Sequence, residues 1–307
     1  MVAPPVEPRV IGVDVGGTKI LAGVVGRDGS IATHREYPTP LDSEDALLEG
    51  LEAAVRELLD ESVVAVGFGI PSRIDQRTGT AIGSVNIPLV DLPFRDVMAE
   101  RLALPVAIEN DGNAAAVAEW MAGAARGVDD LVMLTLGTGV GGGLIFGGRP
   151  YRGSIGAGGE LGHVVVVHDG VLCSCGGHGH LESYVSGKAA GEIAREAFGP
   201  AADAHRLVRL ANEGDPTAND LMREIGRKLG SGLGSIVNAY DPELIVIGGG
   251  FAAAGELLLA PAREVMEREA LKPMREGMRV VRAELGTSAG MIGAAFVAFE
   301  AVDAGSA

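Results

Sequence analysis

The stretch that decides the fold is "VIGVDVGGTKILAGVVGRDG", residues 10–29. It starts with a β-branched run, passes through a glycine pair and continues directly into a second apolar run over 19–26. Asp28-Gly29 is a hairpin signal, and residues 30–37 are typical of a third strand. The stretch therefore predicts a strand, a glycine-threonine loop, a second strand and a tight turn.

Residues 132–148, "VMLTLGTGVGGGLIFGG", repeat this plan of strand, glycine-threonine loop, strand and turn. The repeat indicates a duplication at the scale of a domain. A chain of 307 residues is long for one core and sufficient for two lobes. We expect a small lobe over 1–112, a large lobe over 113–287, and a closing helix at about 288–302 that packs on the small lobe.

Helices and strands alternate along the rest of the chain, which predicts an α/β fold. The expected helices are 43–61 with Ser43 as its cap, 113–125, 186–198, 203–213, 215–240, 252–270 and 288–302. The further expected strands are 63–70, 104–110, 131–136, 142–146, 242–250 and 278–285.

The formal net charge is −16, which repels phosphate backbones and anionic lipids. We therefore expect small-molecule ligands and neither nucleic acid nor membrane as a partner. The N-terminal "MVAPPVEPRV" has no apolar signal-peptide core, and the longest apolar runs are too short to span a bilayer. These features predict a cytoplasmic protein.

The first glycine loop combines an acid, two glycines, a hydroxyl and a cation, at Asp14, Gly16, Gly17, Thr18 and Lys19. Such turns present several backbone N–H groups to a phosphate. The same residues are also compatible with a plain hairpin that exposes its aspartate.

The second glycine loop, Gly137-Thr138-Gly139, lies in "LGTGVGGG" and formally fits G-x-G-x-x-G through Gly142. A dinucleotide-binding fingerprint needs a helix next, whereas "GGLIFGG" predicts a strand and a turn. We therefore disfavour a nicotinamide oxidoreductase. Two such loops on duplicated hairpins suit a nucleotide held between two lobes.

A third glycine run, Gly248-Gly249-Gly250, follows the expected strand "LIVIG". It is compatible with a simple strand-to-helix turn. Beside two phosphate loops, it favours a place where the backbone packs against adenosine.

The segment "ENDGNA", residues 109–114, lies between an expected strand and an expected helix. Asn110 and Asp111 would project from the strand end toward the interlobe cleft, where a carboxylate can accept a hydroxyl proton. Alternatively, Asp111 or Asn113 caps the helix.

The stretch "CSCGGHGHLES", residues 173–183, holds the only two cysteines of the chain. A disulfide within Cys173-Ser-Cys175 would be strained. With His163 and a histidine from 178 or 180, the cysteines form an N/S ligand set that suits Zn²⁺. The alternative is a reduced surface pair with unpaired histidines. His34, His168 and His205 suggest no partners, and we take them as ordinary surface residues.

Together these motifs resemble the ROK family, the bacterial sugar kinases and sugar-responsive repressors of the actin-like ATPase superfamily. Asp14-Val-Gly-Gly-Thr-Lys19 and Leu136-Gly-Thr-Gly139 resemble its two phosphate loops, and Glu109 through Ala114 resembles its catalytic segment. Glu160-Leu-Gly-His163 and Cys173 through Glu182 fit its C-x-C-G-x-x-G-C-x-E signature. The resemblance covers nearly the whole chain and implies two βββαβα cores with an interlobe cleft.

The resemblance implies an ATP- and Mg²⁺-dependent hexose kinase, with glucose as the first candidate and fructose, mannose, N-acetylmannosamine or N-acetylglucosamine as alternatives. In that role Asp111 is the base and Asp14 supports the metal ion. The implied sugar pocket consists of Asn86, Asn110, Asp111, Glu160, His163 and Glu182. The implied structural zinc site consists of His163, Cys173, Cys175 and His180. The family also suggests a homodimer or homotetramer.

Two residues depart from the family pattern: His180 replaces the third cysteine, and Ser72 replaces a glycine near the sugar. Histidine is an equivalent zinc ligand, although His178 is a close competitor. Repressors of the family carry a helix-turn-helix before the first loop, whereas 13 residues with three prolines precede Asp14 here, so we expect a kinase. Because the phosphate loops lie elsewhere in the sequence, zinc loss is expected to affect sugar more than ATP.

Overall fold

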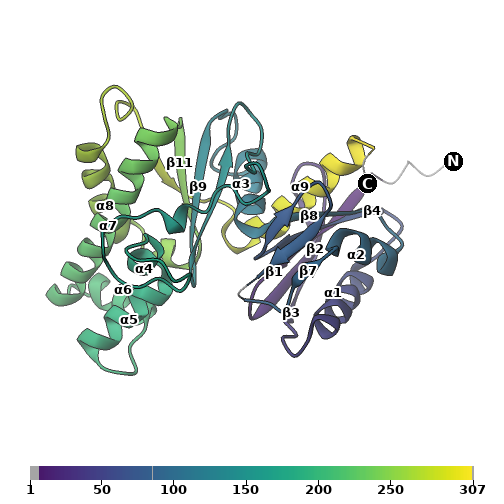
Figure 1. Ribbon diagram of the computed structural model, residues 1–307, viewed down its shortest axis with the longest axis horizontal. Helices are drawn as coiled ribbons and strands as arrows, with labels where there is room; N and C mark the ends of the chain where they lie inside the picture. Colours follow the sequence, from purple (N-terminus) through teal and green to yellow (C-terminus); the bar gives the residue numbers. More distant parts are fainter. Residues whose placement is uncertain (1–6, 85, 306–307) are drawn as a thin grey trace.

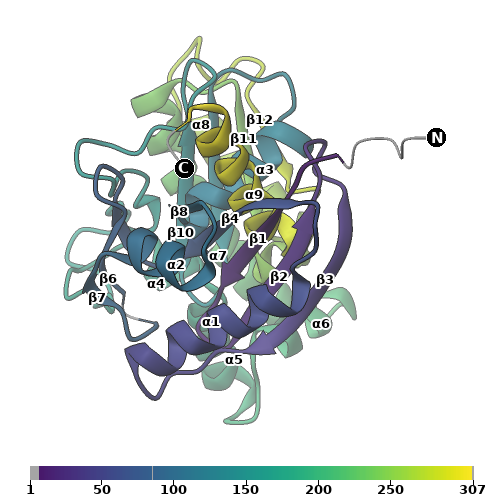
Figure 2. The same ribbon diagram turned by 90° about the vertical axis from the view of Figure 1, so that its right-hand side faces the viewer.

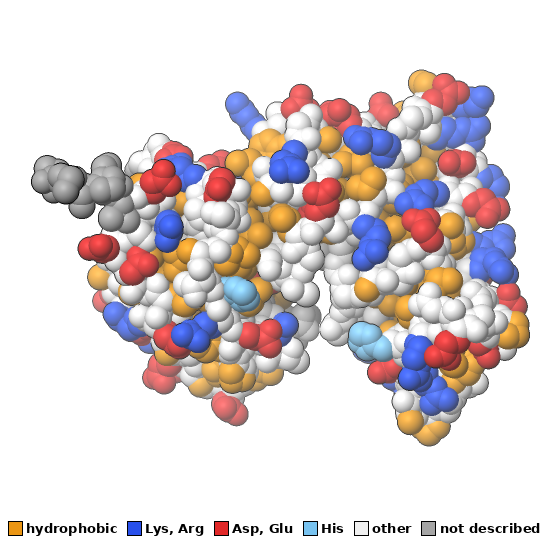
Figure 3. Space-filling model, turned by 180° about the vertical axis from the view of Figure 1, so that it is seen from behind, with side chains coloured by type: hydrophobic (Ala, Val, Ile, Leu, Met, Phe, Trp, Pro, Cys, Tyr) orange, Lys and Arg blue, Asp and Glu red, His pale blue; other side chains and the backbone are white. Residues whose placement is uncertain are grey.

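The computed structural model describes residues 7–84 and 86–305. Residues 1–6, part of the N-terminal stretch expected to carry no signal peptide, lie outside the described residues. The two main sheets belong to separate lobes (Figure 1), and the surface is notched between these lobes (Figure 3). This arrangement confirms the expected two-lobed α/β fold.

The small lobe is built on a five-stranded sheet in the order β3-β2-β1-β4-β8. Its strands are β1 (Arg9–Val15), β2 (Lys19–Val25), β3 (Ile31–Pro38), β4 (Val63–Ile70) and β8 (Val106–Asn110). The first three strands are antiparallel neighbours, and β4 and β8 continue the sheet in parallel with β1. The deciding stretch thus folds as the sequence predicts.

Helices α1 (Glu44–Leu58) and α2 (Phe94–Leu102) pack on the outer side of this sheet (Figure 2). Ser43 caps α1 by accepting from the Ala46 N–H, and the apolar stripe of α1 is buried in the small-lobe core. Helix α2 and the small sheet of β5 (Arg73–Asp75), β6 (Thr80–Gly83) and β7 (Val90–Leu92) were not predicted from the sequence. Strands of three or four residues carry too little periodicity to be recognised.

The large lobe is built on a four-stranded sheet in the order β10-β9-β11-β12. Its strands are β9 (Leu131–Leu136), β10 (Val140–Ile145), β11 (Leu244–Gly248) and β12 (Arg279–Arg282). Strands β10, β9, β11 and β12 take the places that β2, β1, β4 and β8 have in the small lobe. Because no strand in the part of the chain that the structure describes corresponds to β3, β10 lies at the edge of the sheet. Among the described residues, an isolated bridge from Ile145 to Pro150 stands where the first core has its third strand.

Side chains of β9 alternate between two cores, as expected for a strand covered on both faces. Val132 and Leu134 face the core shared with the helices α4 (Glu182–Val185), α5 (Gly187–Phe198), α6 (Ala204–Asn212), α7 (Pro216–Tyr240) and α8 (Glu256–Glu269). Leu131 and Met133 face the core shared with α3 (Asp111–Ala122) and α9 (Ala289–Asp303).

Helices α3 and α9 lie between the two sheets, with α3 against β9 and β10 and α9 against β1, β4 and β8. They cross where Gly293 of α9 meets the Ala114 carbonyl of α3, so closely that a methyl group at Gly293 would overlap that oxygen. Small residues along both helices therefore set how near the lobes approach each other. The lobe division at residue 112 stays a prediction, because α3 contacts both sides.

Several expected elements have different bounds in the structure, and three of these differences have a clear cause. The helix expected at 113–125 begins at Asp111 and ends at Ala122, because the Asn110 side chain caps it. The helix expected at 252–270 is divided into a 3₁₀ turn (Gly250–Ala254) and α8, because Gly255 between them has a positive φ of 60°.

The strand expected at 278–285 ends at Arg282. Beyond it, the backbone N–H groups of Glu284 and Leu285 donate to the carboxylate of Glu119 instead of pairing with a strand. Glu119 is fully buried in α3, so this contact fixes the chain just before α9. In residues 7–84 and 86–305, every helix is too short or too polar to cross a membrane.

Candidate active site

The amino end of α3 presents the aspartate that the sequence analysis singled out. The Asn110 side chain caps the helix by accepting from the N–H groups of Gly112 and Asn113, so Asn110, and not Asp111 or Asn113, is the cap. Asp111 Oδ1 accepts a hydrogen bond from the Gly112 N–H at 2.9 Å. Burial raises the pKa of Asp111, and the nearby charge of Glu160 raises it further.

Asp14 lies at the end of β1, beside the same cleft. Burial and the charge of Asp111 raise its pKa to about 7, although Lys19 acts in the opposite direction. Gly290, at the start of α9, packs so tightly on the Asp14 carboxylate that a methyl group there would lie 2.5 Å from it. Two carboxyl groups, one from strand β1 and one from the start of α3, thus meet in one poorly hydrated place, as is typical of functional sites.

The first glycine loop is a tight turn closed by a hydrogen bond from the Gly16 N–H to the Lys19 carbonyl. Thr39 supports the turn, since its hydroxyl donates to the Gly16 carbonyl at 2.7 Å. Thr18 is exposed and available to a ligand. The Lys19 ammonium, expected to bind phosphate, is instead paired with Glu36 at 2.6 Å, so phosphate binding by Lys19 would require this pair to open.

The second glycine loop is closed in the same way, by a hydrogen bond from the Gly137 N–H to the Gly139 carbonyl. Strand β10 follows it directly, so the loop lacks the helix that a dinucleotide fingerprint requires. Gly137 and Thr138 form one end of a cavity of about 780 Å³, which the amino ends of α5 and α6 and the 3₁₀ turn at Gly250 also line.

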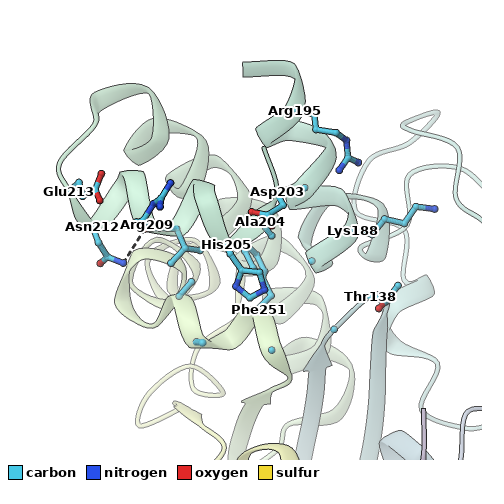
Figure 4. A pocket seen from close by; sticks show the side chains of 17 residues that line it. Thr138, Lys188, Arg195, Asp203, Ala204, His205, Arg209, Asn212, Glu213 and Phe251 are labelled. Atoms are coloured by element: carbon cyan, nitrogen blue, oxygen red, sulfur yellow. Dashed lines mark hydrogen bonds between the residues drawn. The ribbon is translucent and has the colours of Figure 1, made fainter. Parts of the chain in front are cut away.

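Figure 4 shows how this cavity runs from Thr138 and Lys188 at one end to Asn212 and Glu213 at the other. Its volume lies within the range of about 300–1,000 Å³ that is usual for ligand pockets. Four basic side chains line it, from Lys188, Arg195, His205 and Arg209. The acidic Asp203 and Glu213 also line it, so the basic groups are only partly balanced. A cavity that begins at a glycine loop and holds several basic side chains is compatible with a nucleotide.

The third glycine run contributes unequally to this cavity. Gly250 and the neighbouring Phe251 line it. Gly248 and Gly249 pack instead against Met133 and Leu136 of β9, so they shape the strand end behind the cavity.

Three further residues expected in the sugar pocket lie near Asp111 or near the first glycine loop. Glu160 directly precedes a short 3₁₀ segment (Leu161–His163) that ends at His163, and His163 Nε2 lies 3.8 Å from Glu160 Oε2. Asn86 is exposed on the small lobe and its carbonyl oxygen lies beside Gly17 of the first loop.

Ser72, which replaces a glycine of the family pattern, is buried and its hydroxyl lies within hydrogen-bond distance of the Gly83 and Arg73 carbonyls. Its own carbonyl accepts from the Asn110 side chain. This contact with Asn110 uses the backbone of residue 72, so a glycine at this position would provide it as well.

The cysteine loop gathers four potential metal ligands: His163, Cys173, Cys175 and His180. Their ligand atoms all lie within 4.8 Å of one another. Cys173 Sγ is 3.7 Å from His163 Nδ1, and Cys175 Sγ is 3.2 Å from His180 Nδ1. These separations approach the edge of a zinc tetrahedron, roughly 3.3–3.8 Å for bonds of about 2.0–2.3 Å.

His178 faces away from this cluster, with Nδ1 3.1 Å from the Gly170 carbonyl. The geometry therefore favours His180 over His178 as the fourth ligand. Two nitrogen and two sulfur donors form a set that could hold a zinc ion.

Glu182, at the start of α4, connects this cluster with the second glycine loop. Its Oε2 accepts from the Val140 N–H at 2.9 Å, and its Oε1 lies 3.7 Å from Cys173 Sγ. This contact could not be predicted from the sequence, because Glu182 and Val140 are 42 residues apart. The cluster of potential metal ligands is therefore connected to the second glycine loop through Glu182.

Sequence reasoning missed the basic residues of the cavity and took His205 as an ordinary surface residue. His205 is in the first turn of α6, and Lys188 is in the first turn of α5. The caps Asp203 and Ser186 were visible as helix starts. Only the fold shows that both helix starts face the second glycine loop.

Two lobes that meet at buried carboxylates, with a glycine-threonine hairpin in each, define the actin-like ATPase fold. The family within this class is also clear: residues 10–301 match the ROK family, and the chain belongs to it.

Relatives and solved structures agree with this assignment. The chain is 36% identical to the glucokinase of Streptomyces coelicolor, over 94% of this chain and 97% of that protein. It is 34% identical to the N-acetyl-D-glucosamine kinase of Shigella boydii, over 93% of this chain and 98% of that protein. The crystal structure of a ROK family glucokinase from Streptomyces griseus, in complex with glucose and AMPPNP, superposes with a TM-score of 0.85 at 38% identity, covering 95% and 99% of the two chains.

Proposed function

We propose that this protein is an ATP-dependent hexose kinase that phosphorylates D-glucose at its 6-hydroxyl. The observation that carries the proposal is Asp111, a partly buried carboxylate at the amino end of α3, close to Glu160 and Asp14. The similarity to a glucokinase that binds glucose and AMPPNP supports both the acceptor and the donor.

In the proposed reaction, Asp111 accepts the proton of the 6-hydroxyl while the hydroxyl oxygen attacks the γ-phosphorus in line. The bond from that phosphorus to the β–γ bridging oxygen breaks, and ADP leaves. A raised pKa makes Asp111 a stronger base than an ordinary aspartate, provided that it is ionised before the step.

The proposed sugar site uses hydrogen-bonding side chains from both lobes. Its members are Asn86, Asn110, Asp111, Glu160, His163 and Glu182. Asn110 is held in place from both ends, because its Oδ1 caps α3 and its amide donates to the Ser72 carbonyl. Such a fixed amide can select the position of a ring hydroxyl.

The proposed nucleotide site begins at the two glycine loops and extends into the cavity of Figure 4. Its phosphate contacts come from Asp14, Gly16, Gly17, Thr18, Lys19, Gly137, Thr138 and Gly139. Lys188 adds a positive charge beside Thr138, and adenosine extends toward Gly250 and Phe251, with Gly248 and Gly249 behind them. Mg²⁺ would neutralise charge on the phosphate oxygens, with Asp14 as its support, directly or through water.

The proposed structural metal is zinc, held by His163, Cys173, Cys175 and His180. Zinc would supply folding free energy to a loop that has little core of its own. His163 Nδ1 faces the cluster and Nε2 faces Glu160, so the same ring can orient a sugar ligand.

We further propose a cytoplasmic location, where ATP is supplied, and a homodimer or homotetramer. Size-exclusion chromatography with light scattering decides the oligomeric state.

ADP release measured over a panel of hexoses with ATP and Mg²⁺ tests the function. We expect glucose to give the highest kcat/KM. A kcat/KM ten times higher for N-acetylglucosamine, N-acetylmannosamine, mannose or fructose than for glucose would show that glucose is not the preferred substrate. The assignment as a sugar kinase would still stand. No stimulation of ADP release by any sugar would reject the kinase.

A further inference from the structure

The segment between β10 and Glu160 crosses from the large lobe to the small lobe. We define residues 151–159 as the strap. The strap is closed at its base by a hydrogen bond from the Gly158 N–H to the Arg152 carbonyl at 2.8 Å. Gly156, with a φ of 78°, lies against the Ile74 carbonyl of β5 so closely that a methyl group would overlap it. The strap is thus pressed onto the small lobe.

A second contact of the strap is an ion pair between the lobes. The Arg152 Nε–H donates to Glu109 Oε2 at 2.6 Å, and a terminal nitrogen of Arg152 lies 4.0 Å from Glu300 Oε2. Glu109 is only 1% exposed at the end of β8, while the Arg152 side chain is 25% exposed. Among the ion pairs of the described residues, Arg152 is the one cation that contacts Glu109.

The other oxygen of Glu109 organises the start of α3. Oε1 accepts from the Asn110 N–H at 2.9 Å and from the side-chain amides of Asn113 and Gln76 at 3.2 Å. Asn110 and Asn113 stand on either side of Asp111. The position of Asp111 therefore depends on how firmly the Glu109 carboxylate is held.

A buried carboxylate that loses its cation moves toward water or toward another hydrogen-bond donor. Either change would disturb the hydrogen bonds that Oε1 accepts. From this geometry we infer that Arg152 is a positioning residue that fixes Asp111 through Glu109, so that the base is correctly placed only while the strap is docked on the small lobe. The inference rests on the proposed function, since it assumes that Asp111 is the base.

The test compares kinetic constants of wild type, Arg152→Ala, Arg152→Lys and Glu109→Gln. Arg149→Ala is the matched control, because Arg149 is exposed in the same segment and no ion pair of the described residues includes its side chain. We expect Arg152→Ala to lower kcat by about 10- to 100-fold, as small misplacements of a reacting group do. The KM for ATP should stay within about twofold, because the nucleotide cavity lies elsewhere.

The double variant Arg152→Ala/Glu109→Gln separates positioning from general stability. If Arg152 acts through the charge of Glu109, the loss of kcat in the double variant should be much smaller than the product of the two single losses. Purely multiplicative losses, or a kcat for Arg152→Ala equal to that of Arg149→Ala, would overturn the inference. A lower melting temperature with unchanged kcat would overturn it as well.

If the Arg152→Ala variant does not fold, the kcat of Arg152→Lys tests the positioning role instead. Its ammonium keeps the charge but lacks the planar fork that reaches Glu109 and Glu300 together. We expect a loss of at least about threefold in kcat, in line with that geometry, and equality with Arg149→Ala would reject the role of the guanidinium. If the wild-type protein releases no ADP with any sugar, the proposed function itself is wrong. If the wild type is active and the Arg152 variants have the same kcat, only the positioning role of Arg152 is wrong.

Discussion

Replacing Asp14 with Asn should stabilise the ligand-free protein at high pH. The pKa of Asp14 is raised from 3.8 to about 7, mainly by burial and then by the charge of Asp111. The folded state therefore holds a proton on Asp14 over a pH range in which the unfolded state has released it. Stability from this group is complete below pH 3.8 and is lost as the pH rises through about 7.

The size of the effect follows from the shift of about three pKa units. At about 1.36 kcal/mol per unit, ionised Asp14 costs the folded state at most about 4 kcal/mol at pH 8. Asn carries no charge, so Asp14→Asn should be more stable than wild type by about 1–4 kcal/mol at pH 8, while the difference should approach zero near pH 4.

Urea unfolding at a series of pH values, without nucleotide or metal, measures this difference. Asp28→Asn is the matched control, because hydrogen bonds from Ser30 lower the pKa of the exposed Asp28, so this variant should gain nothing at pH 8. A stability difference between Asp14→Asn and wild type that does not grow between pH 4 and pH 8 would refute the reasoning.

Three further predictions concern the metal loop and the nucleotide cavity. His180→Ala should lose bound zinc and His178→Ala should keep it, because His178 faces the Gly170 carbonyl; metal analysis that finds the reverse would reject the ligand set. Removing zinc with a chelator should raise the KM for ATP as well as for glucose, since Glu182 joins the cluster to the second glycine loop; steady-state kinetics that show an unchanged KM for ATP would contradict this link. Lys188→Met should raise the KM for ATP about tenfold, the value of one charge-assisted contact, and leave the KM for glucose within about twofold; an unchanged KM for ATP would remove Lys188 from the site.

The sequence was sufficient for features that are encoded locally. The two glycine-threonine hairpins, the Asn110-Asp111 pair at the junction of β8 and α3, and the cluster of His163, Cys173 and Cys175 all follow from residue types at short spacing. The fold class followed from the repeat of one such hairpin.

Other features depend on contacts between distant segments and could not be read from the sequence. Lys188 and His205 have the appearance of exposed helix residues, and their role in the cavity emerges only when α5 and α6 meet the second glycine loop. Arg152 and Glu109 are 43 residues apart, and neither shows its partner by its neighbours. The link of Glu182 to Val140 spans 42 residues, so the sequence did not show that the cysteine loop also contacts the second glycine loop.

The most direct test of the central claim is to measure glucose 6-phosphate formation and glucose binding for wild type and Asp111→Asn in parallel. The amide keeps the size of the side chain and can still hydrogen-bond a hydroxyl, but it cannot take up the proton. We predict that wild type forms glucose 6-phosphate with ATP, that Asp111→Asn loses about 10²–10⁴-fold or more in kcat, and that calorimetry gives a Kd for glucose within a few-fold of wild type. An Asp111→Asn variant that retains half of the wild-type kcat would show that the base lies elsewhere and would contradict the account.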